Sequence, residues 1–185
     1  MLLFSFASAC ASSPGGLASD DGVSSRVTRT NDCWPVMPLR LDALEHGRDW
    51  EPVCSLRADG TILNQRGALG VLRDDAFRIG APDNKTAILE GRCRERKAEL
   101  RTPLAPAILA RVEYDRQDTF RELGGDHTTI RVGDDGFVDM QVRGRARFGP
   151  PGTGGGVVRV VGDVNAGRRT AALLMFIAAG IGAGR

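Results

Sequence analysis

Asp126 and His127 stand side by side in the chain, and an acid that orients a histidine is a common arrangement for general base catalysis. Neighbouring residues of a strand face opposite sides, however, so an adjacent pair rarely meets. The chain also lacks the Gly-x-Ser-x-Gly pattern of a nucleophilic serine and the His-Glu-x-x-His pattern of a metal site. We therefore expect an exposed loop histidine in a protein that is not an enzyme. A small extracytoplasmic enzyme that uses His127 is an alternative.

Three aspartates surround Gly136, namely Asp134, Asp135 and Asp139. Carboxylates bind Ca²⁺, but a calcium loop needs more oxygen donors at alternate positions and a closing glutamate. The Asp-Gly step is also typical of a hairpin turn, which is the simpler interpretation. No Cys-x-x-Cys occurs, and two histidines are too few for a usual structural zinc site. We expect no metal and no other cofactor.

The glycine-rich stretch 149–156 reads Gly-Pro-Pro-Gly-Thr-Gly-Gly-Gly. It resembles the phosphate loop of ATPases of the AAA type, whose main-chain amides surround phosphates. Gly155 stands where that family has the phosphate-binding lysine, and Gly156 where it has the hydroxyl that holds magnesium. The following Val157–Val161 run indicates a strand, whereas a phosphate loop opens a helix. We expect a connection between strands and no nucleotide binding.

Three cysteines lie in the body of the chain, at positions 33, 54 and 93. An exported protein could form one disulfide from them and leave one thiol. Cys33 and Cys54 have similar surroundings, each near a tryptophan, a proline and a valine, and they are the pair we expect; free, buried cysteines are the alternative. The nearby Trp34 and Trp50 could form a recognition surface, although such residues more often belong to the core.

The charge of the chain gives little reason to expect a nucleic-acid partner. The formal net charge is only +2, so no global field attracts a polyanion. A basic cluster comprises Arg92, Arg94, Arg96 and Lys97, but Glu95 and Glu99 interrupt it and no aromatic residue lies between to stack on bases. We expect these residues to form a solvated face.

Short segments of alternating polarity, separated by turn residues, predict a mainly β domain between residues 32 and 166. Asp59-Gly60 and Asp134-Asp135-Gly136 each predict a hairpin, the first with a type I′ turn. The expected strands are 55–58, 61–64, 68–72, 76–79, 108–114, 128–132, 137–142 and 157–164. Residues 39–48 suggest a helical turn or a loop, and residues 86–100 fit a strand pair or a helix. The rhythm is that of a β-meander that forms a small sandwich or an open barrel.

The apolar C-terminal run predicts a helix over residues 167–185, centred on 170–184. Fifteen helical residues reach about 22 Å, which is shorter than the roughly 30 Å hydrocarbon core of a bilayer. We expect this helix to pack on the sheet. A membrane-associated segment and a helix that docks on a partner remain as alternatives.

The N-terminus carries an uncharged run, Met1-Leu-Leu-Phe-Ser-Phe-Ala-Ser-Ala, that ends in small residues directly before Cys10. This arrangement resembles a bacterial lipoprotein signal peptide, although no basic residue precedes the run and Ala7 replaces the usual leucine. The resemblance implies a signal peptide over residues 1–9, lipidation of Cys10 and a flexible tether over residues 10–31. An ordinary N-terminus with an inert Cys10 is the alternative.

Together these observations predict an outer-membrane lipoprotein of the bacterial envelope, facing the periplasm or the cell surface and held by its lipid anchor. Ala11 after Cys10 carries no acidic retention signal, which in the lipoprotein family implies the outer membrane. We expect a non-catalytic structural or binding role, alone or with other envelope proteins. The alternative to that role is an oligomerising, membrane-associated assembly subunit that docks through residues 170–184.

Overall fold

The computed structural model describes residues 33–44, 49–80, 89–102 and 105–182. The signal peptide, Cys10 and the tether that the sequence predicts lie outside these residues. The described chain forms thirteen strands and one helix. They are β1 (Leu39–Leu44), β2 (Trp50–Leu56), β3 (Thr61–Asn64), β4 (Gly67–Arg73), β5 (Ala76–Ile79), β6 (Leu89–Arg94), β7 (Lys97–Thr102), β8 (Ala105–Tyr114), β9 (Phe120–Leu123), β10 (Thr129–Val132), β11 (Val138–Val142), β12 (Arg145–Phe148), β13 (Val157–Gly162) and α1 (Val164–Gly182).

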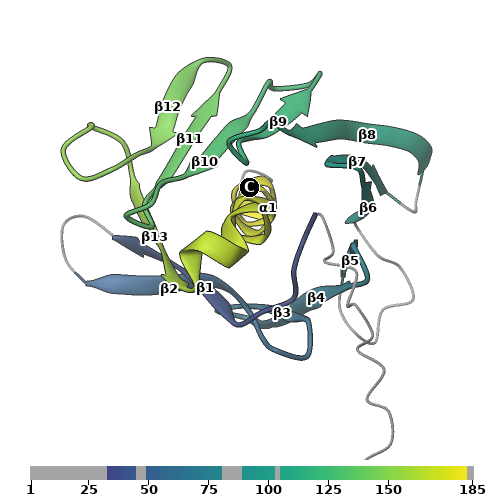
Figure 1. Cartoon of the computed structure of the whole chain (residues 1–185), viewed down its shortest axis with the longest axis horizontal. Coiled ribbons are helices and arrows are strands. Elements are labelled where there is room, and N and C mark those ends of the chain that lie inside the picture. The colour runs from purple at the N-terminus through teal and green to yellow at the C-terminus, as the bar shows by residue number, and fades with distance from the viewer. Residues whose placement is uncertain (1–32, 45–48, 81–88, 103–104, 183–185) are drawn as a thin grey trace, which may run out of the picture.

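All thirteen strands belong to one antiparallel sheet that curls into a nearly closed barrel around α1 (Figure 1). Strands β1 to β12 follow one another as a meander, and β13 returns to pair with β1. A single bridge between Phe137 and Arg159 joins β13 to the segment before β11. The mainly β meander with a C-terminal helix that the sequence predicts is confirmed, in the form of a barrel.

Several hairpins turn through two consecutive residues with positive φ, as a type I′ turn requires. Asp74-Asp75, Glu95-Arg96 and Arg143-Gly144 have this conformation. At Asp59-Gly60 only the glycine has a positive φ, of 84°, so the predicted type I′ turn is wrong. The Gly60 amide donates to the Arg57 carbonyl at 3.0 Å, and the left-handed glycine then closes a longer hairpin with a bulge.

Two ambiguous segments of the sequence are strands. Residues 39–44 form β1 rather than a helical turn, because Leu39 and Leu41 point inward while β1 pairs with both β2 and β13. Between residues 86 and 100, β6 and the start of β7 form the strand-pair alternative. Their outward side chains are charged and their inward residues are few, which conceals the two-residue period.

Helix α1 fills one part of the barrel interior, where it packs chiefly on β1, β2, β9, β10 and β13. It begins three residues earlier than expected because Asp163 caps it, its carboxylate accepting from the Ala166 amide at 3.1 Å. Leu173, Leu174 and Ile177 are at most 1% exposed. Packing on the sheet, the expected arrangement, is therefore correct, and residues 170–177 present no broad apolar face for docking.

The segment of residues 33–38 fills another part of the interior, and we call it the wedge. In Figure 1 it runs as a purple trace between α1 and strands β5 to β7. Trp34 is fully buried and meets the β5 residue Phe77 edge to face, with ring centroids 5.5 Å apart. Its indole N–H donates to the hydroxyl of Tyr114, at the end of β8, at 2.6 Å. The wedge thus supports the inner side of β5 to β8.

Among the described residues, no helix is both long and apolar enough to cross a membrane.

Candidate functional site: a groove lined by arginine

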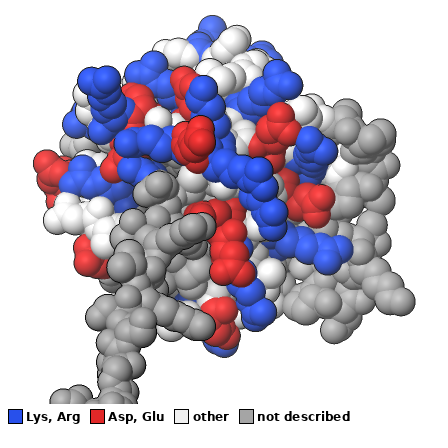
Figure 2. Space-filling model, turned by 45° about the vertical axis from the view of Figure 1, so that its right-hand side comes forward, with Lys and Arg blue, Asp and Glu red and all other residues white. Residues whose placement is uncertain are grey.

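Charged side chains cover the outer face of β4 to β9, where Figure 2 shows blue and red residues close together. The strand registers order them in rows that cross the sheet. The central row contains Arg73, Ala76, Arg92, Glu99, Arg111 and Leu123. The row on one side of it contains Val71, Arg78, Glu90 and Arg101. The row on its other side contains Arg94, Lys97, Glu113 and Arg121. The alternation of each strand therefore gathers residues that lie far apart in the sequence.

These side chains form the walls of a groove of about 880 Å³, within the size range of small-ligand sites. Seven of the lining residues are cationic and two are acidic. The cations are Arg73, Arg78, Arg92, Arg94, Lys97, Arg101 and Arg111, and the acids are Glu90 and Glu99. Val71 and Leu123, which are 37% and 48% exposed, add apolar surface. The groove combines a positive field with some apolar surface.

The glutamates neutralise one side of the groove. Glu99 accepts a hydrogen bond from Arg101 at 2.7 Å and lies 3.6 Å from the guanidinium of Arg111. The hydrogen bond from Arg101 is the main cause that lowers the pKa of Glu99, so this carboxylate stays ionised at neutral pH. Arg121, in the next row, pairs with Asp115 at 3.0 Å. The cations on this side thus have internal counter-charges.

On the other side of the groove, the described residues supply no counter-charge for the cations. Arg73, Arg92, Arg94 and Lys97 are all exposed, and none of them has an ion-pair partner in the described part of the chain. Like charges at this spacing repel one another, at a cost that grows as water is displaced. An anion that entered this side would relieve the repulsion.

Ala76 forms a notch between two of these cations. It is the register partner of Arg73 on one side and of Arg92 on the other. Because adjacent strands lie about 4.8 Å apart, the two arginines stand about 10 Å apart across a methyl group. Two guanidinium groups that flank a small residue can donate together to one oxyanion. Arg94 and Lys97 form a second pair, one row farther along β6 and β7.

The fourth cation of the predicted basic cluster lies elsewhere. Arg96 occupies the turn after β6, and its guanidinium donates to Asp118 at 2.6 Å. The solvated face is thus confirmed for Arg92, Arg94 and Lys97, which are exposed. Sequence reasoning missed the contributions of Arg73 and Ala76 because they lie on other strands. The sequence did offer one signal of the groove: Arg92 and Arg94 are two residues apart, so on a strand both side chains lie on the same face.

The predicted Cys33–Cys54 disulfide is wrong, because the structure joins Cys33 to Cys93 instead. Cys93 faces inward on β6, which the wedge approaches, whereas Cys54 faces inward on β2. Cys54 is a free, buried thiol, and burial raises its pKa to about 12. Similar local surroundings in the sequence therefore say nothing about which cysteines meet across the barrel.

The candidate catalytic and metal residues do not converge. His127 is exposed in the loop between β9 and β10, and the carboxylate of Asp126 accepts instead from Arg143 at 2.9 Å. Asp134 pairs with Arg168, and Asp135 accepts from the Phe137 amide in the turn. Within the described residues, no three metal-ligating side chains form a cluster.

The remaining predicted features also have structural positions. Residues 149–156 connect β12 to β13, and no helix follows them directly, as expected for a connection between strands. Trp34 belongs to the core, whereas Trp50 is half-buried and lies under the guanidinium of Arg159, 4.1 Å from the ring centroid. The two tryptophans therefore do not make a shared exposed surface.

Fold and groove together define a class: a single meander barrel around a C-terminal helix, with a cationic groove on its outer wall. No family model matches this chain, and no curated protein or solved structure shows significant similarity to it.

Proposed function

We propose that this protein is a non-catalytic binding module whose groove takes a multivalent oxyanion. The observation that carries the proposal is a set of four cations on one side of the groove, Arg73, Arg92, Arg94 and Lys97, for which the described residues supply no ion-pair partner. Glu99 and Glu113 are the register partners of Arg92 and Lys97, but in the described part of the chain they form no ion pair with them, and Glu99 accepts from Arg101 instead. An anionic ligand can supply the counter-charge that these four cations lack.

The arrangement of these cations suggests how the anionic groups are spaced. Residues two apart on a strand are separated by about 7 Å and neighbouring strands by about 4.8 Å, so the centre of the Arg73–Arg92 pair lies about 10 Å from the centre of the Arg94–Lys97 pair. A ligand with two phosphate, sulfate or carboxylate groups about 10 Å apart would satisfy both. A phospholipid headgroup region and a soluble oligophosphate share this chemistry.

We also propose that Cys10 is lipidated and holds the domain at a bacterial envelope membrane. The support is the apolar run before Cys10 and the small residues Ala7, Ser8 and Ala9. The test is the intact mass of protein extracted from membranes. Loss of residues 1–9 together with acyl mass is expected, and a chain that retains Met1 without acyl mass would disprove it.

The groove is tested by calorimetric titration with tripolyphosphate and, separately, by co-sedimentation with phosphatidylglycerol vesicles. Arg92→Gln removes a central donor and should weaken binding about 10-fold to 100-fold, as expected for a charged hydrogen bond. Ala76→Glu places a carboxylate in the notch and should abolish binding. Arg145→Gln is the matched control, because it removes the same charge from an exposed position on β12.

Each outcome has a defined meaning. Groove-dependent binding of tripolyphosphate identifies a soluble oligophosphate type of ligand, and groove-dependent binding of vesicles alone identifies a lipid headgroup. Equal losses with Arg92→Gln and Arg145→Gln would mean that only net charge matters, which contradicts a specific groove. Absence of binding to both probes would also overturn the proposal.

A further inference from the structure

The wall that carries the groove has an unusual support on its inner side. Helix α1 packs chiefly on β1, β2, β9, β10 and β13, whereas the wedge lies behind β5 to β8. Trp34 contacts Phe77 on β5 and Tyr114 on β8, and its amide donates to the Asp75 carboxylate at 3.4 Å. The position of these strands therefore depends on the wedge.

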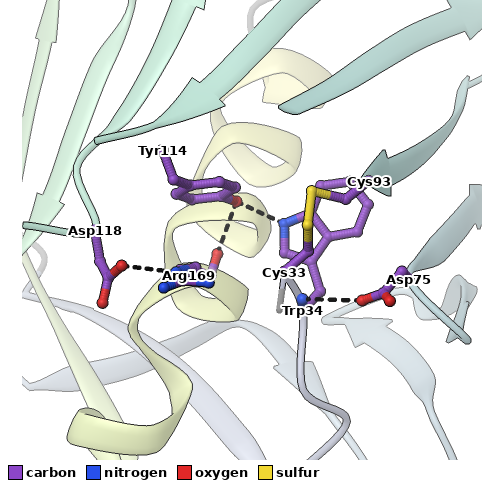
Figure 3. The surroundings of a disulfide bond; sticks show 7 residues. All are labelled: Cys33, Trp34, Asp75, Cys93, Tyr114, Asp118 and Arg169. Carbon is purple, nitrogen blue, oxygen red and sulfur yellow. Dashed lines mark hydrogen bonds and ion pairs between the residues drawn. A yellow bond between two sulfur atoms is a disulfide. The ribbon is translucent and has the colours of Figure 1, made fainter. Parts of the chain in front are cut away.

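A covalent bond joins the wedge to the middle of the groove wall (Figure 3). Cys93 faces inward on β6 and forms the disulfide with Cys33, while its neighbours Arg92 and Arg94 face outward into the groove. The Cys93 amide also donates to the Asp75 carbonyl at 2.8 Å, in the turn that follows Arg73. Arg92 and Arg94 thus lie next to the residue that the disulfide joins to the wedge, and Arg73 lies two residues before Asp75, which accepts from the Trp34 amide.

The wedge is also tied to α1, so that it forms one unit with the rest of the interior. The Tyr114 hydroxyl receives the indole N–H of Trp34 and donates to the Arg169 carbonyl at 3.1 Å. The Thr170 hydroxyl donates to the Pro35 carbonyl at 2.9 Å. If the disulfide opened, the wedge would be held by these few hydrogen bonds, by the packing of Trp34 and Met37, and by its continuation into β1.

A small polar pocket of about 210 Å³, separate from the groove, borders Cys33. It is lined by Cys33, Pro35, Asp118, Asn165, Ala166, Arg168 and Arg169. The sulfur atoms belong to residues that are at most 3% exposed, so this pocket marks the side from which a reductant could reach Cys33 after a local opening.

We propose that the Cys33–Cys93 disulfide is a redox latch that controls anion binding in the groove. This inference rests on the proposed function, because it concerns the same groove. In the oxidised protein the wedge holds β6, and with it Arg92 and Arg94, in the arrangement that binds. Reduction frees the wedge, and the cations lose their fixed spacing.

The reductant belongs to the class of dithiols. One thiolate of the dithiol attacks Cys33 or Cys93, the S–S bond breaks, and a mixed disulfide forms. The second thiol of the dithiol then displaces the remaining cysteine. Two electrons and two protons pass to the protein, Cys33 and Cys93 become thiols, and the dithiol becomes a cyclic disulfide.

The test uses the full chain in dithiothreitol redox buffers, with and without saturating tripolyphosphate or, where only vesicles bind, phosphatidylglycerol vesicles. Alkylation of Cys33 and Cys93, read by peptide mass spectrometry, gives the fraction reduced. Because coupling between two sites is reciprocal, the anion should make the disulfide harder to reduce by the factor by which reduction weakens anion binding. We expect a shift of at least fivefold in the equilibrium constant. Arg92→Gln should remove it, and Arg145→Gln should keep it.

A second measurement avoids dependence on a stably folded reduced protein. Trp34→Phe keeps the disulfide but removes the hydrogen bond to Tyr114, and it should weaken anion binding in the oxidised protein by a factor of two or more. If the oxidised protein binds neither probe, the proposed function fails. If it binds but the redox equilibrium does not shift, the latch is disproved while the binding function stands.

Discussion

At the scale of single residues, burial decides which groups are chemically active. Cys54 is a thiol enclosed among the strands near α1, and desolvation raises its pKa to about 12. Tyr114 is likewise buried, and its pKa is raised because its ionised form would lose water. Both groups are therefore neutral over the physiological range and serve the core. The exposed arginines of the groove are the groups that we propose to bind an anion.

The Cys54 thiol predicts how stability depends on alkaline pH. Its pKa is higher in the folded protein than in the unfolded chain, where it is near 9, so its contribution to stability is complete below pH 9 and falls as the pH rises towards 12. Between pH 9 and 10 the free energy of unfolding should fall by about 1 kcal/mol because of this group. Urea denaturation at a series of pH values measures it.

Cys54→Val provides the control for this prediction. Valine has no proton to lose, so between pH 9 and 10 the variant should lose about 1 kcal/mol less stability than the original protein loses. Tyr114 contributes mainly above pH 10, since its unfolded pKa is 10.0. Identical pH profiles for the variant and the original protein would show that Cys54 is not the titrating group.

At the scale of elements, close contact between neighbouring strands limits what can replace glycine. A Cβ on Gly70 of β4 would lie 2.0 Å from the carbonyl oxygen of Arg78 on β5. Backbone cannot move away as a flexible side chain can, so the strands would have to separate. Gly180 of α1, by contrast, has open space around the position of a Cβ.

These two glycines give opposite predictions for the same substitution. Gly70→Ala should destabilise the protein by about 2 kcal/mol or more, because overpacking forces a backbone shift. Gly180→Ala should stabilise it by up to about 1 kcal/mol, since alanine favours the helical conformation. Thermal unfolding of both variants checks the pair, and a similar effect for both would contradict the packing described for β4 and β5.

At the scale of the whole molecule, the barrel depends on what it encloses. Helix α1, whose Leu173, Leu174 and Ile177 are buried, packs on β1, β2 and β13 and also on β9 and β10. The sheet pairs β13 with β1, but between β13 and the β11–β12 end it forms only isolated bridges. The helix therefore links β1, β2 and β13 to β9 and β10 through the interior.

Deletion of residues 164–185 should consequently expose the interior. We expect an aggregating chain that binds a dye for apolar surfaces, measured by size-exclusion chromatography and dye fluorescence. Leu109→Ala is a suitable control, since Leu109 is 56% exposed and its truncation should change stability by less than about 0.5 kcal/mol. A monodisperse, folded monomer without α1 would contradict this role of the helix.

The elements were more predictable than the site. Asp134-Asp135-Gly136 and the alternation of residues 108–114 predicted a hairpin and a strand correctly, because turn chemistry and polarity act over a few residues. Residues 39–44 were ambiguous, since the exposed Arg40 and the buried Asp42, to which Arg40 donates, interrupt the apolar pattern. The groove could not be predicted, because Arg73 and Arg92 meet only through strand registers.

The sequence by itself determined the mainly β class, several of the turns and a C-terminal helix, because these depend on local preference and on the polarity of neighbouring residues. Only the tertiary structure decided that the sheet encloses the helix and that Cys33 pairs with Cys93 rather than Cys54. It also decided that Ala76 lies between two arginines. These outcomes depend on which strands become neighbours when the sheet curls, and sequence proximity does not encode that geometry.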